Sequence, residues 1–275
     1  MPELPEIELV AVALRNDVLE KTITRAELLR EKLAPDDSPK VFSERLQNVV
    51  IKEVYRRGKY LVVKTDSEFS LLVHLRMTGK FNLLNENEEN PKHTHAEFVF
   101  NSGNRLAFVD QRHFGFMKTH KTAKLVDYFA SKKLAPEPFS DQFSGAYLRN
   151  VTTKSKSAIK DLLLNQQKVC GLGNIYAAEA LHLAGIHPTK PANKISLRKI
   201  NLLYDAIIRV LTEAVEFGNR TTFEINSIEN GYINRDEGWL VYDREGKPCF
   251  KCEKTILRAI HHGRSNFFCP NCQRK

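Results

Sequence analysis

The sequence predicts an α+β protein of two domains: an N-terminal helix with an antiparallel β-sandwich, then a helical domain that ends in a small ribbon. Three observations lead to this fold class. Apolar residues recur at helical spacing over 5–19, short β-branched and aromatic runs fill 23–119, and helical spacing returns after residue 140. Many short strands without intervening helices favour a sandwich. A chain of 275 residues is long enough for two cores.

The first half is expected to hold one helix and a series of strands. Ile7, Val10, Ala11, Leu14 and Val18 form one apolar face of the helix over 5–19. Strands are expected where short apolar runs end at turn signals, at residues 23–29, 49–55, 60–64, 69–75, 95–100, 105–109 and 114–119.

A break in regular structure separates the two halves. The run Leu-Ala-Pro-Glu-Pro-Phe interrupts any helix or strand, which predicts a linker at 134–140 between domains at 1–133 and 141–240, with the ribbon at 241–275. In the second domain, Ser157 is expected to cap a helix and Asn174 to begin another that ends before Gly185. A third helix should start at Ser196 and be closed by Gly218.

The composition narrows the functional classes. The formal net charge of +9 suggests an anionic partner. No apolar run approaches 18 residues, so no membrane span is expected. The first residues carry glutamates rather than a basic segment followed by an apolar one, so they do not read as a secretory signal. We therefore expect a cytoplasmic protein.

Four of the five cysteines stand close together near the C-terminus. Cys249-x2-Cys252 is followed, after sixteen residues, by Cys269-x2-Cys272, a spacing typical of zinc sites. Without a secretory signal, thiolates on a metal are favoured over disulfides. Four thiolates complete a tetrahedron, which indicates one structural Zn²⁺ per chain rather than a catalytic metal. The fifth cysteine, Cys170, is expected to be a small buried side chain.

The first residues are candidates for chemistry. If Met1 is removed, the chain begins with Pro2, a secondary amine, and an α-amino group has an ordinary pKa of roughly 7.7–8. Such an amine attacks a carbonyl-like carbon to give a cationic iminium, and Glu3 and Glu6 place acid/base groups beside it. The alternative is a simple helix start, with Pro5 in the first turn and the glutamates facing the helix dipole.

Several turns carry residues suited to nucleic acid. The Gly-Leu-Gly run before Asn174 forms either an anion site at a helix N-terminus or a tight turn between helices. The Arg-Arg-Gly-Lys turn that ends at Lys59 is either a solvated hairpin tip or a cluster of cations for an anionic partner. Met77 and Phe114 are either core residues or, with Arg112, an apolar wedge that replaces a base pulled out of a duplex.

Seven motifs follow one another along the chain: Pro-Glu-Leu-Pro-Glu, Arg-Gly-Lys-Tyr, His-Leu-x-Met-x-Gly, Asp-x-Arg-x-Phe-Gly, Gly-x-Gly-Asn-Ile-Tyr-x-x-Glu-Ala-Leu, Ala-Gly-Ile-His-Pro and Gly-Arg-Ser-x-Phe-Phe-Cys-Pro-x-Cys-Gln-Arg. In this order they resemble the formamidopyrimidine-DNA glycosylase/endonuclease VIII family, and within it the bacterial repair enzymes that excise oxidised purines. The likeness spans essentially the whole chain. It implies a helix–two-turn–helix domain, a zinc finger, and damaged double-stranded DNA as the partner.

The resemblance also implies an activity and the residues that perform it. By this likeness Pro2 is the nucleophile that attacks C1′ of the damaged nucleoside, and Glu3 is the proton donor that helps open the sugar. Glu6 orders the site, and Lys59 contacts a phosphate and can act as an acid or base. The implied enzyme is bifunctional: a glycosylase and a DNA-(apurinic or apyrimidinic site) lyase that cleaves the strand by β,δ-elimination.

A second set of residues is implied to hold the DNA. Met77, Arg112 and Phe114 match the trio that fills the gap left by the everted base, with Arg112 facing the orphaned cytosine. Asn174 and Arg264 match the phosphate clamps around the lesion. A helix lysine near the pocket is matched by Lys160.

Some positions depart from the family pattern and leave alternatives open. Arg76 stands where a small residue is usual, Gln111 where Pro is usual, and Asn165 where Asp is usual. The loop that covers the damaged base, at 223–240, does not align cleanly, so an endonuclease VIII-like preference for oxidised pyrimidines is one alternative. A non-catalytic binder of damaged DNA is another. A monomer is expected because each lesion is an asymmetric target.

Overall fold

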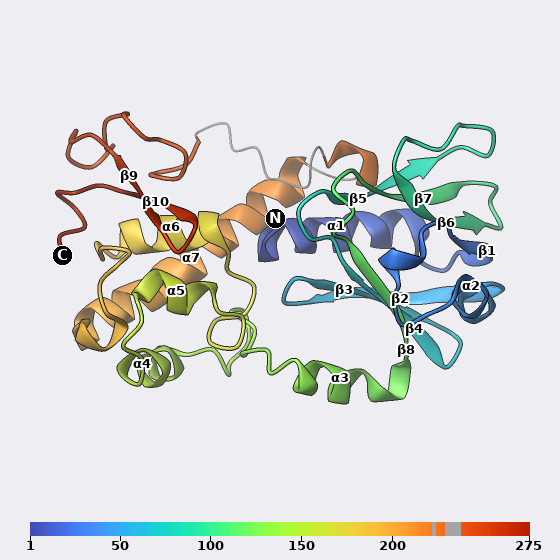
Figure 1. Cartoon of the computed structure of the whole chain (residues 1–275), viewed down its shortest axis with the longest axis horizontal. Helices are drawn as coiled ribbons and strands as arrows, with labels where there is room; N and C mark the ends of the chain where they lie inside the picture. The colour runs from blue at the N-terminus through green and yellow to red at the C-terminus, as the bar shows by residue number, and fades with distance from the viewer. Residues whose placement is uncertain (222–223, 229–237) are drawn as a thin grey trace. The chain divides into compact units, whose positions relative to one another are not determined.

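The computed structural model describes residues 1–221, 224–228 and 238–275, which form two compact units (Figure 1). Unit 1 comprises Met1–Ser131 and the described part of Val215–Ile233, and unit 2 comprises Lys132–Ala214 and the described part of Asn234–Lys275. Most of the loop expected at 223–240 lies outside the described residues. Within the described chain, no helix has the length and apolar character needed to cross a membrane.

Unit 1 begins with helix α1 (Leu4–Val18), as the apolar spacing predicts. Pro5 lies in the first turn, where a missing N–H leaves no bond unmade. The Glu6 carboxylate accepts a hydrogen bond from the backbone N–H of Glu3 at 2.8 Å, the return bond of a capping box. The glutamates therefore do start the helix, but both are buried, which a helix start alone does not require.

The sandwich consists of eight antiparallel strands: β1 (Thr22–Leu28), β2 (Val49–Arg57), β3 (Tyr60–Thr65), β4 (Phe69–His74), β5 (Gly79–Leu84), β6 (Thr94–Phe100), β7 (Arg105–Asp110) and β8 (Phe116–Lys121). Their order is β5-β7-β6-β1-β2-β3-β4-β8. Strands β1 and β2 share only the pairs Thr22 with Val50 and Ile23 with Val49, so the sheet divides there into two four-stranded layers. Figure 1 shows α1 running along these strands.

One apolar core joins α1 to both layers. Ile7 and Leu14 of α1 belong to the same buried cluster as Leu61 of β3 and Phe108 of β7. Because α1 contributes to this core, its first turn is held in place by the whole sandwich. Packing therefore holds the residues at the start of α1 in a fixed position.

Helix α7 (Leu197–Thr221) shows where one prediction is wrong. Gly218 was expected to close this helix, but the helix continues to Thr221. A Cβ atom at Gly218 would lie 2.2 Å from Cδ1 of Leu9 in α1, so no larger residue fits without a shift. The glycine is explained by close packing against α1, not by a turn.

The spacing argument missed one strand and two α-helices of unit 1: β5, α2 (Pro39–Leu46) and α3 (Leu125–Ser131). Helix α2 has a clear start signal, because the Ser38 hydroxyl accepts a hydrogen bond from the Val41 N–H at 3.3 Å and Pro39 follows. Strand β8 begins at Phe116 rather than at 114, which leaves Phe114 in a loop.

Unit 2 is helical, as expected. Residues 132–144 form no helix or strand, and then come α4 (Gly145–Thr153), α5 (Ile159–Leu164), α6 (Asn174–Leu183) and the first part of α7. The expected Ser157 cap is wrong: Ala158 precedes α5, and the Ser157 hydroxyl pairs with Ser155 at 2.8 Å. Helix α6 ends as predicted, with Gly185 at a φ of +62° that glycine adopts without strain.

The ribbon of unit 2 is a two-stranded hairpin with the cysteines around it. Strands β9 (Leu257–His261) and β10 (Arg264–Phe268) pair antiparallel, from His261 with Arg264 to Leu257 with Phe268. Its buried cluster is small and includes Cys249 and Cys269 themselves. Cys170 lies outside the ribbon and is fully buried, as predicted.

Candidate active site and nucleic-acid interface

The N-terminus of unit 1 gathers ionisable groups that are buried. Pro2 is buried although Met1 is exposed, and Glu3 and Glu6 are 2% and 1% exposed. Carboxylates this deeply buried are rare unless they are bound by donors or serve a function. The structure thus places three predicted site residues together at the start of α1.

Lys59 joins this environment from the β2–β3 hairpin. Gly58 adopts a φ of +60°, which makes the tight turn, and Lys59 follows it with only 5% of its surface exposed. The Arg56 guanidinium is also drawn inward and pairs with Glu8 of α1 at 2.7 Å. The interpretation of this turn as a solvated hairpin tip is therefore wrong for both residues.

The charged groups around the N-terminus shift the pKa of the first amine of the chain. Burial lowers the pKa of the Met1 amine from its ordinary value, Glu3 and Glu6 raise it, and Lys59 and Arg112 lower it, with a net lowering. A lowered pKa leaves more of the amine unprotonated at neutral pH, and only the unprotonated amine is a nucleophile. The environment at the N-terminus therefore suits nucleophilic chemistry.

Met77, Arg112 and Phe114 form an exposed cluster on unit 1. Met77 is 40% and Phe114 54% exposed, so the interpretation of these side chains as core residues is wrong. Arg112 lies between them: its guanidinium donates to Met77 Sδ at 3.2 Å and lies 5.1 Å from the centre of the Phe114 ring. Large apolar side chains exposed next to a cation suit contact with stacked bases.

Asp110, which the sequence argument overlooked, holds the loop that carries Arg112 and Phe114. Its side chain is fully buried and accepts hydrogen bonds from the N–H groups of Gly115 at 2.6 Å and Arg112 at 3.2 Å, and from the Thr78 hydroxyl. Burial raises the pKa of Asp110, but the bonds from Thr78, Gly115 and Arg112 outweigh it, so the pKa is lowered. A charged Asp110 fixes this loop and links it to the Met77–Thr78 turn.

Asn174 begins α6, as predicted, but does not cap it. Gly173 occupies the cap position, and the Asn174 side-chain oxygen is buried without a hydrogen-bond partner in the described chain. The turn before it is held by Gln166, which accepts from the Gly171 N–H at 2.9 Å and donates to the Leu172 carbonyl at 2.9 Å. Among the described residues, the local structure therefore leaves the Asn174 side-chain oxygen without a hydrogen bond.

Lys160 and Arg264 meet at the ribbon. The Lys160 ammonium, 1% exposed, donates to the backbone carbonyl of Ser265 at 2.9 Å. Ser265 follows Arg264, which is exposed at the start of β10. The structure thus gives Lys160 a role in supporting the strand that presents Arg264.

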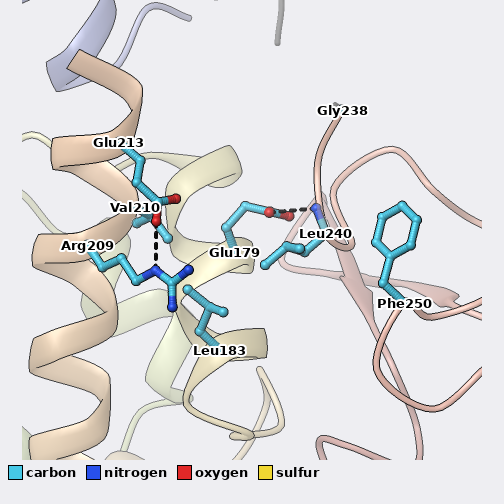
Figure 2. Close-up of a pocket in the computed structure, with 8 residues that line it drawn as sticks. All are labelled: Glu179, Leu183, Arg209, Val210, Glu213, Gly238, Leu240 and Phe250. Atoms are coloured by element: carbon cyan, nitrogen blue, oxygen red, sulfur yellow. Dashed lines mark hydrogen bonds and ion pairs between the residues drawn. The ribbon is translucent and has the colours of Figure 1, made fainter. Parts of the chain in front are cut away.

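Glu179 is a second residue that the sequence argument left without a role. Its buried carboxylate accepts from the N–H groups of Leu240 at 2.7 Å and of Val241 and Tyr242, both at 2.9 Å. Figure 2 shows it beside a cavity of about 530 Å³, which Arg209 and Glu213 of α7 also line. None of the predicted site residues lines this cavity. Glu179 anchors the chain where it enters the ribbon.

The four clustered cysteines have the geometry of a zinc site. Their sulfurs lie 3.4 Å (Cys252–Cys269), 3.5 Å (Cys252–Cys272) and 4.0 Å (Cys249–Cys272) apart. Zn–S bonds of about 2.3 Å in a tetrahedron place sulfurs roughly 3.8 Å apart, so a single Zn²⁺ fits. Four sulfur ligands leave no open position, which makes the metal structural.

The family comparisons cover most of the chain. Residues 1–117 match the formamidopyrimidine-DNA glycosylase N-terminal domain, residues 134–225 match the formamidopyrimidine-DNA glycosylase H2TH domain, and residues 246–274 match the zinc finger found in FPG and IleRS. The zinc-finger match includes all four clustered cysteines.

Full-length relatives and solved structures agree with these matches. The formamidopyrimidine-DNA glycosylase of Bacillus licheniformis is 40% identical over 278 residues and that of Rickettsia conorii 39% over 275, with at least 99% of each chain covered. The Lactococcus lactis Fpg bound to abasic-site DNA superimposes with a TM-score of 0.92 at 33% identity, covering 99% of this chain and 100% of that one. A MutM complex with DNA containing carbocyclic 8-oxo-G gives 0.92 at 34% identity, covering both chains fully. The chain therefore belongs to the formamidopyrimidine-DNA glycosylase family.

Proposed function

We propose that this protein is a DNA glycosylase and abasic-site lyase that removes oxidised purines, such as 8-oxoguanine and formamidopyrimidines, from double-stranded DNA. The observation that carries the proposal is the burial of Glu3, Glu6 and Lys59 around the first amine of the chain, whose pKa is lowered. A protein that only bound DNA would need no such environment. The full-length likeness to named glycosylases supports the choice of substrate.

The chemistry follows from these groups. After removal of Met1, the Pro2 nitrogen attacks C1′ of the damaged nucleoside and the glycosidic bond breaks. The base leaves with its electron pair and takes up the proton that the nitrogen loses. A proton from Glu3 to the ring oxygen opens the sugar and leaves an iminium between C1′ and Pro2. The iminium acidifies C2′, so loss of a proton there expels the 3′ phosphate, and a second elimination expels the 5′ phosphate. Glu6 holds the Glu3 backbone in place, as the 2.8 Å bond indicates.

Both units contribute to holding the DNA in this proposal. Eversion of the damaged base costs a few kcal/mol, and insertion of Met77, Arg112 and Phe114 into the gap offsets that cost. Cationic and amide groups bind the phosphates that flank the lesion, and we assign these contacts to Lys59, Asn174 and Arg264. Lys160, whose ammonium binds the Ser265 carbonyl, supports the strand that presents Arg264. The chemistry belongs to residues 1–133 and the phosphate contacts mainly to 141–275.

Borohydride trapping tests the proposal. Borohydride reduces the iminium to an amine, so the enzyme should become covalently joined to duplexes containing 8-oxoguanine or an abasic site. Pro2→Gly should lower the rate of base excision at least about a hundredfold. Pro5→Ala, in the first turn of α1, is the matched control and should retain activity. Intact mass must confirm that Met1 is absent; equal crosslinking by protein that keeps Met1 would exclude Pro2 as the nucleophile.

The same assay resolves the alternatives. Release of 8-oxoguanine and formamidopyrimidines well above release of thymine glycol supports the purine preference, and the reverse order indicates an endonuclease VIII-like enzyme. Strongly salt-dependent binding without strand cleavage indicates a non-catalytic binder. We further propose that the enzyme acts as a monomer in the cytoplasm, which light scattering of the complex and fractionation of cells will check.

A further inference from the structure

The turn of the ribbon hairpin brings two histidines onto one carboxylate. His261 Nε2 lies 3.0 Å and His262 Nδ1 3.1 Å from the same atom, Oδ2 of Asp161, which belongs to α5. The two imidazole rings stand 4.0 Å apart between centres. The proposed catalytic residues include none of these three, and the four cysteines of the zinc finger are separate from them.

The backbone of this turn does not call for histidine. His262 and Gly263 connect β9 to β10, with φ values of +47° and +72°. A two-residue turn with both φ values positive favours Asn-Gly or Asp-Gly, because short polar side chains tolerate the left-handed region best. An imidazole at this position therefore needs a reason other than the turn.

The three ligand atoms have the spacing of a metal site. They all lie within 4.8 Å of one another. Metal–ligand bonds of about 2.0–2.2 Å at tetrahedral or octahedral angles place neighbouring ligand atoms roughly 2.9–3.5 Å apart, which both distances to Asp161 match. Imidazole nitrogens suit Zn²⁺, Cu²⁺, Fe²⁺ and Ni²⁺, and Zn²⁺ also accepts carboxylate oxygen.

We propose that His261, His262 and Asp161 form a second metal site, for a divalent transition cation, on the β9–β10 hairpin of the zinc finger. His261 and Asp161 are partly buried, with side chains 31% and 23% exposed, whereas His262 is 71% exposed. The ion therefore enters from solvent on the His262 side. Three protein ligands leave coordination positions open to water or to an anionic oxygen.

Bound metal would fasten the hairpin to α5. Lys160, the neighbour of Asp161, already donates to the carbonyl of Ser265 in β10 at 2.9 Å. Asp161 contacts His261 at the end of β9, so adjacent residues of α5 contact both strands of the hairpin. Arg264 lies between these two attachments in the sequence, directly after the turn. The ion would restrict the motion of the segment that presents Arg264, whatever the reaction catalysed elsewhere.

Calorimetric titration of tag-free, zinc-loaded protein with Zn²⁺ alone tests the site. Zinc is the titrant because exchange at an already filled cysteine centre adds no net binding. We expect one further equivalent in the micromolar range. His262→Asn, which keeps a residue suited to the turn, and Asp161→Asn should each weaken this binding at least about tenfold. His120→Asn, in β8 of unit 1, is the control and should leave it unchanged.

Metal analysis and amide hydrogen exchange complete the test. After dialysis against buffer with free Zn²⁺ a few-fold above the wild-type dissociation constant, the wild type should hold close to two zinc ions. The His262→Asn and Asp161→Asn variants should hold close to one, the ion of the four cysteines. Exchange in 257–268 should slow on adding Zn²⁺ in the wild type only. Absence of a second equivalent, or its persistence in both variants, would overturn the proposal and leave only hydrogen bonds between the histidines and Asp161.

Discussion

Different interactions stabilise the two segments that we propose to contact DNA. These segments are the 110–115 loop of unit 1 and the β9–β10 hairpin of unit 2. The loop rests on Asp110, a buried carboxylate above the core of the sandwich. The hairpin rests on a cluster of six buried residues, two of which are the zinc ligands Cys249 and Cys269. A DNA-contacting segment can thus be held by a core or by a metal, and each support fails under a different perturbation.

Removal of zinc should give the largest effect and should act on unit 2 alone. Structural zinc contributes on the order of 10 kcal/mol or more to small zinc domains, far more than so small a cluster can replace. The ring centre of Trp239, the only tryptophan, lies 5.6 Å from that of Tyr176 and 6.4 Å from that of Tyr242. Its fluorescence emission therefore reports on the ribbon. A chelator should shift this emission to the red and abolish DNA binding, while amide protection in the sandwich stays high.

Cysteine variants sharpen this test. Cys269→Ser should reproduce the effect of the chelator, whereas Cys170→Ala, at a buried cysteine outside the cluster, should keep its zinc. If the chelator left Trp239 emission unchanged, the ribbon would not depend on its metal and the comparison would fail.

Asp110→Asn should give an intermediate effect confined to unit 1. The amide cannot accept all the bonds that the carboxylate accepts from Gly115, Arg112 and Thr78, which should cost about 2 kcal/mol. Binding to abasic-site DNA should weaken about tenfold or more, with zinc content unchanged. Asp127→Asn, at an exposed position of α3, is the control and should bind normally.

Acid should have the same effect as this substitution. The pKa of Asp110 is lowered in the folded protein, so its stabilising effect is present above the unfolded pKa of about 3.9 and is lost as pH falls below it. Protection of the loop amides, measured relative to the intrinsic exchange rate at each pH, should therefore fall in acid for the wild type. Exchange in the Asp110→Asn variant should already be fast at neutral pH; equal protection in both proteins would contradict the anchoring role.

His74 should affect stability at milder pH, by an amount that is smallest near pH 6.5 and grows as the pH falls. Burial, Arg76 and Lys59 together lower the pKa of His74 to about 3, and its Nδ1 accepts the Arg76 N–H at 3.1 Å. In the unfolded chain His74 binds a proton near pH 6.5, whereas in the folded protein it stays neutral at that pH. The free energy of unfolding should thus fall by up to about 1.4 kcal/mol per pH unit below 6.5.

Urea titrations of the His74→Asn variant between about pH 4.5 and 6.5 measure how much His74 contributes to the pH dependence of the free energy of unfolding. Asparagine keeps an acceptor near the Nδ1 position but does not titrate, so its stability should depend less steeply on pH. Parallel slopes for the two proteins would show that His74 does not stay neutral in the folded state.

Local signals predicted some of these features and could not predict others. The cysteine spacing defined the zinc site, and the apolar period defined α1, because both depend on residues close in sequence. The burial of Lys59 and the anchoring by Asp110 depend on strands that meet only in the folded sheet. The same holds for Gly218, whose packing partner Leu9 is far away in the chain. A turn such as 56–60 looks solvated until its neighbours are placed.

The exposed cluster of Met77, Arg112 and Phe114 also could not be predicted from local sequence signals. Met77 and Phe114 have the composition of core residues, and only the fold shows them at the surface beside Arg112. Only the family motifs predicted the wedge role that we propose for them, since no periodicity in the sequence separates a wedge from a core side chain.

The most direct test of the account is the site of attachment in the borohydride-reduced complex. Digestion of that complex and tandem mass spectrometry should locate the sugar remnant on the α-nitrogen of Pro2, at a chain that has lost Met1. A remnant on Lys59 or on any other lysine, with Pro2 unmodified, would contradict the claim that the N-terminal amine performs the chemistry.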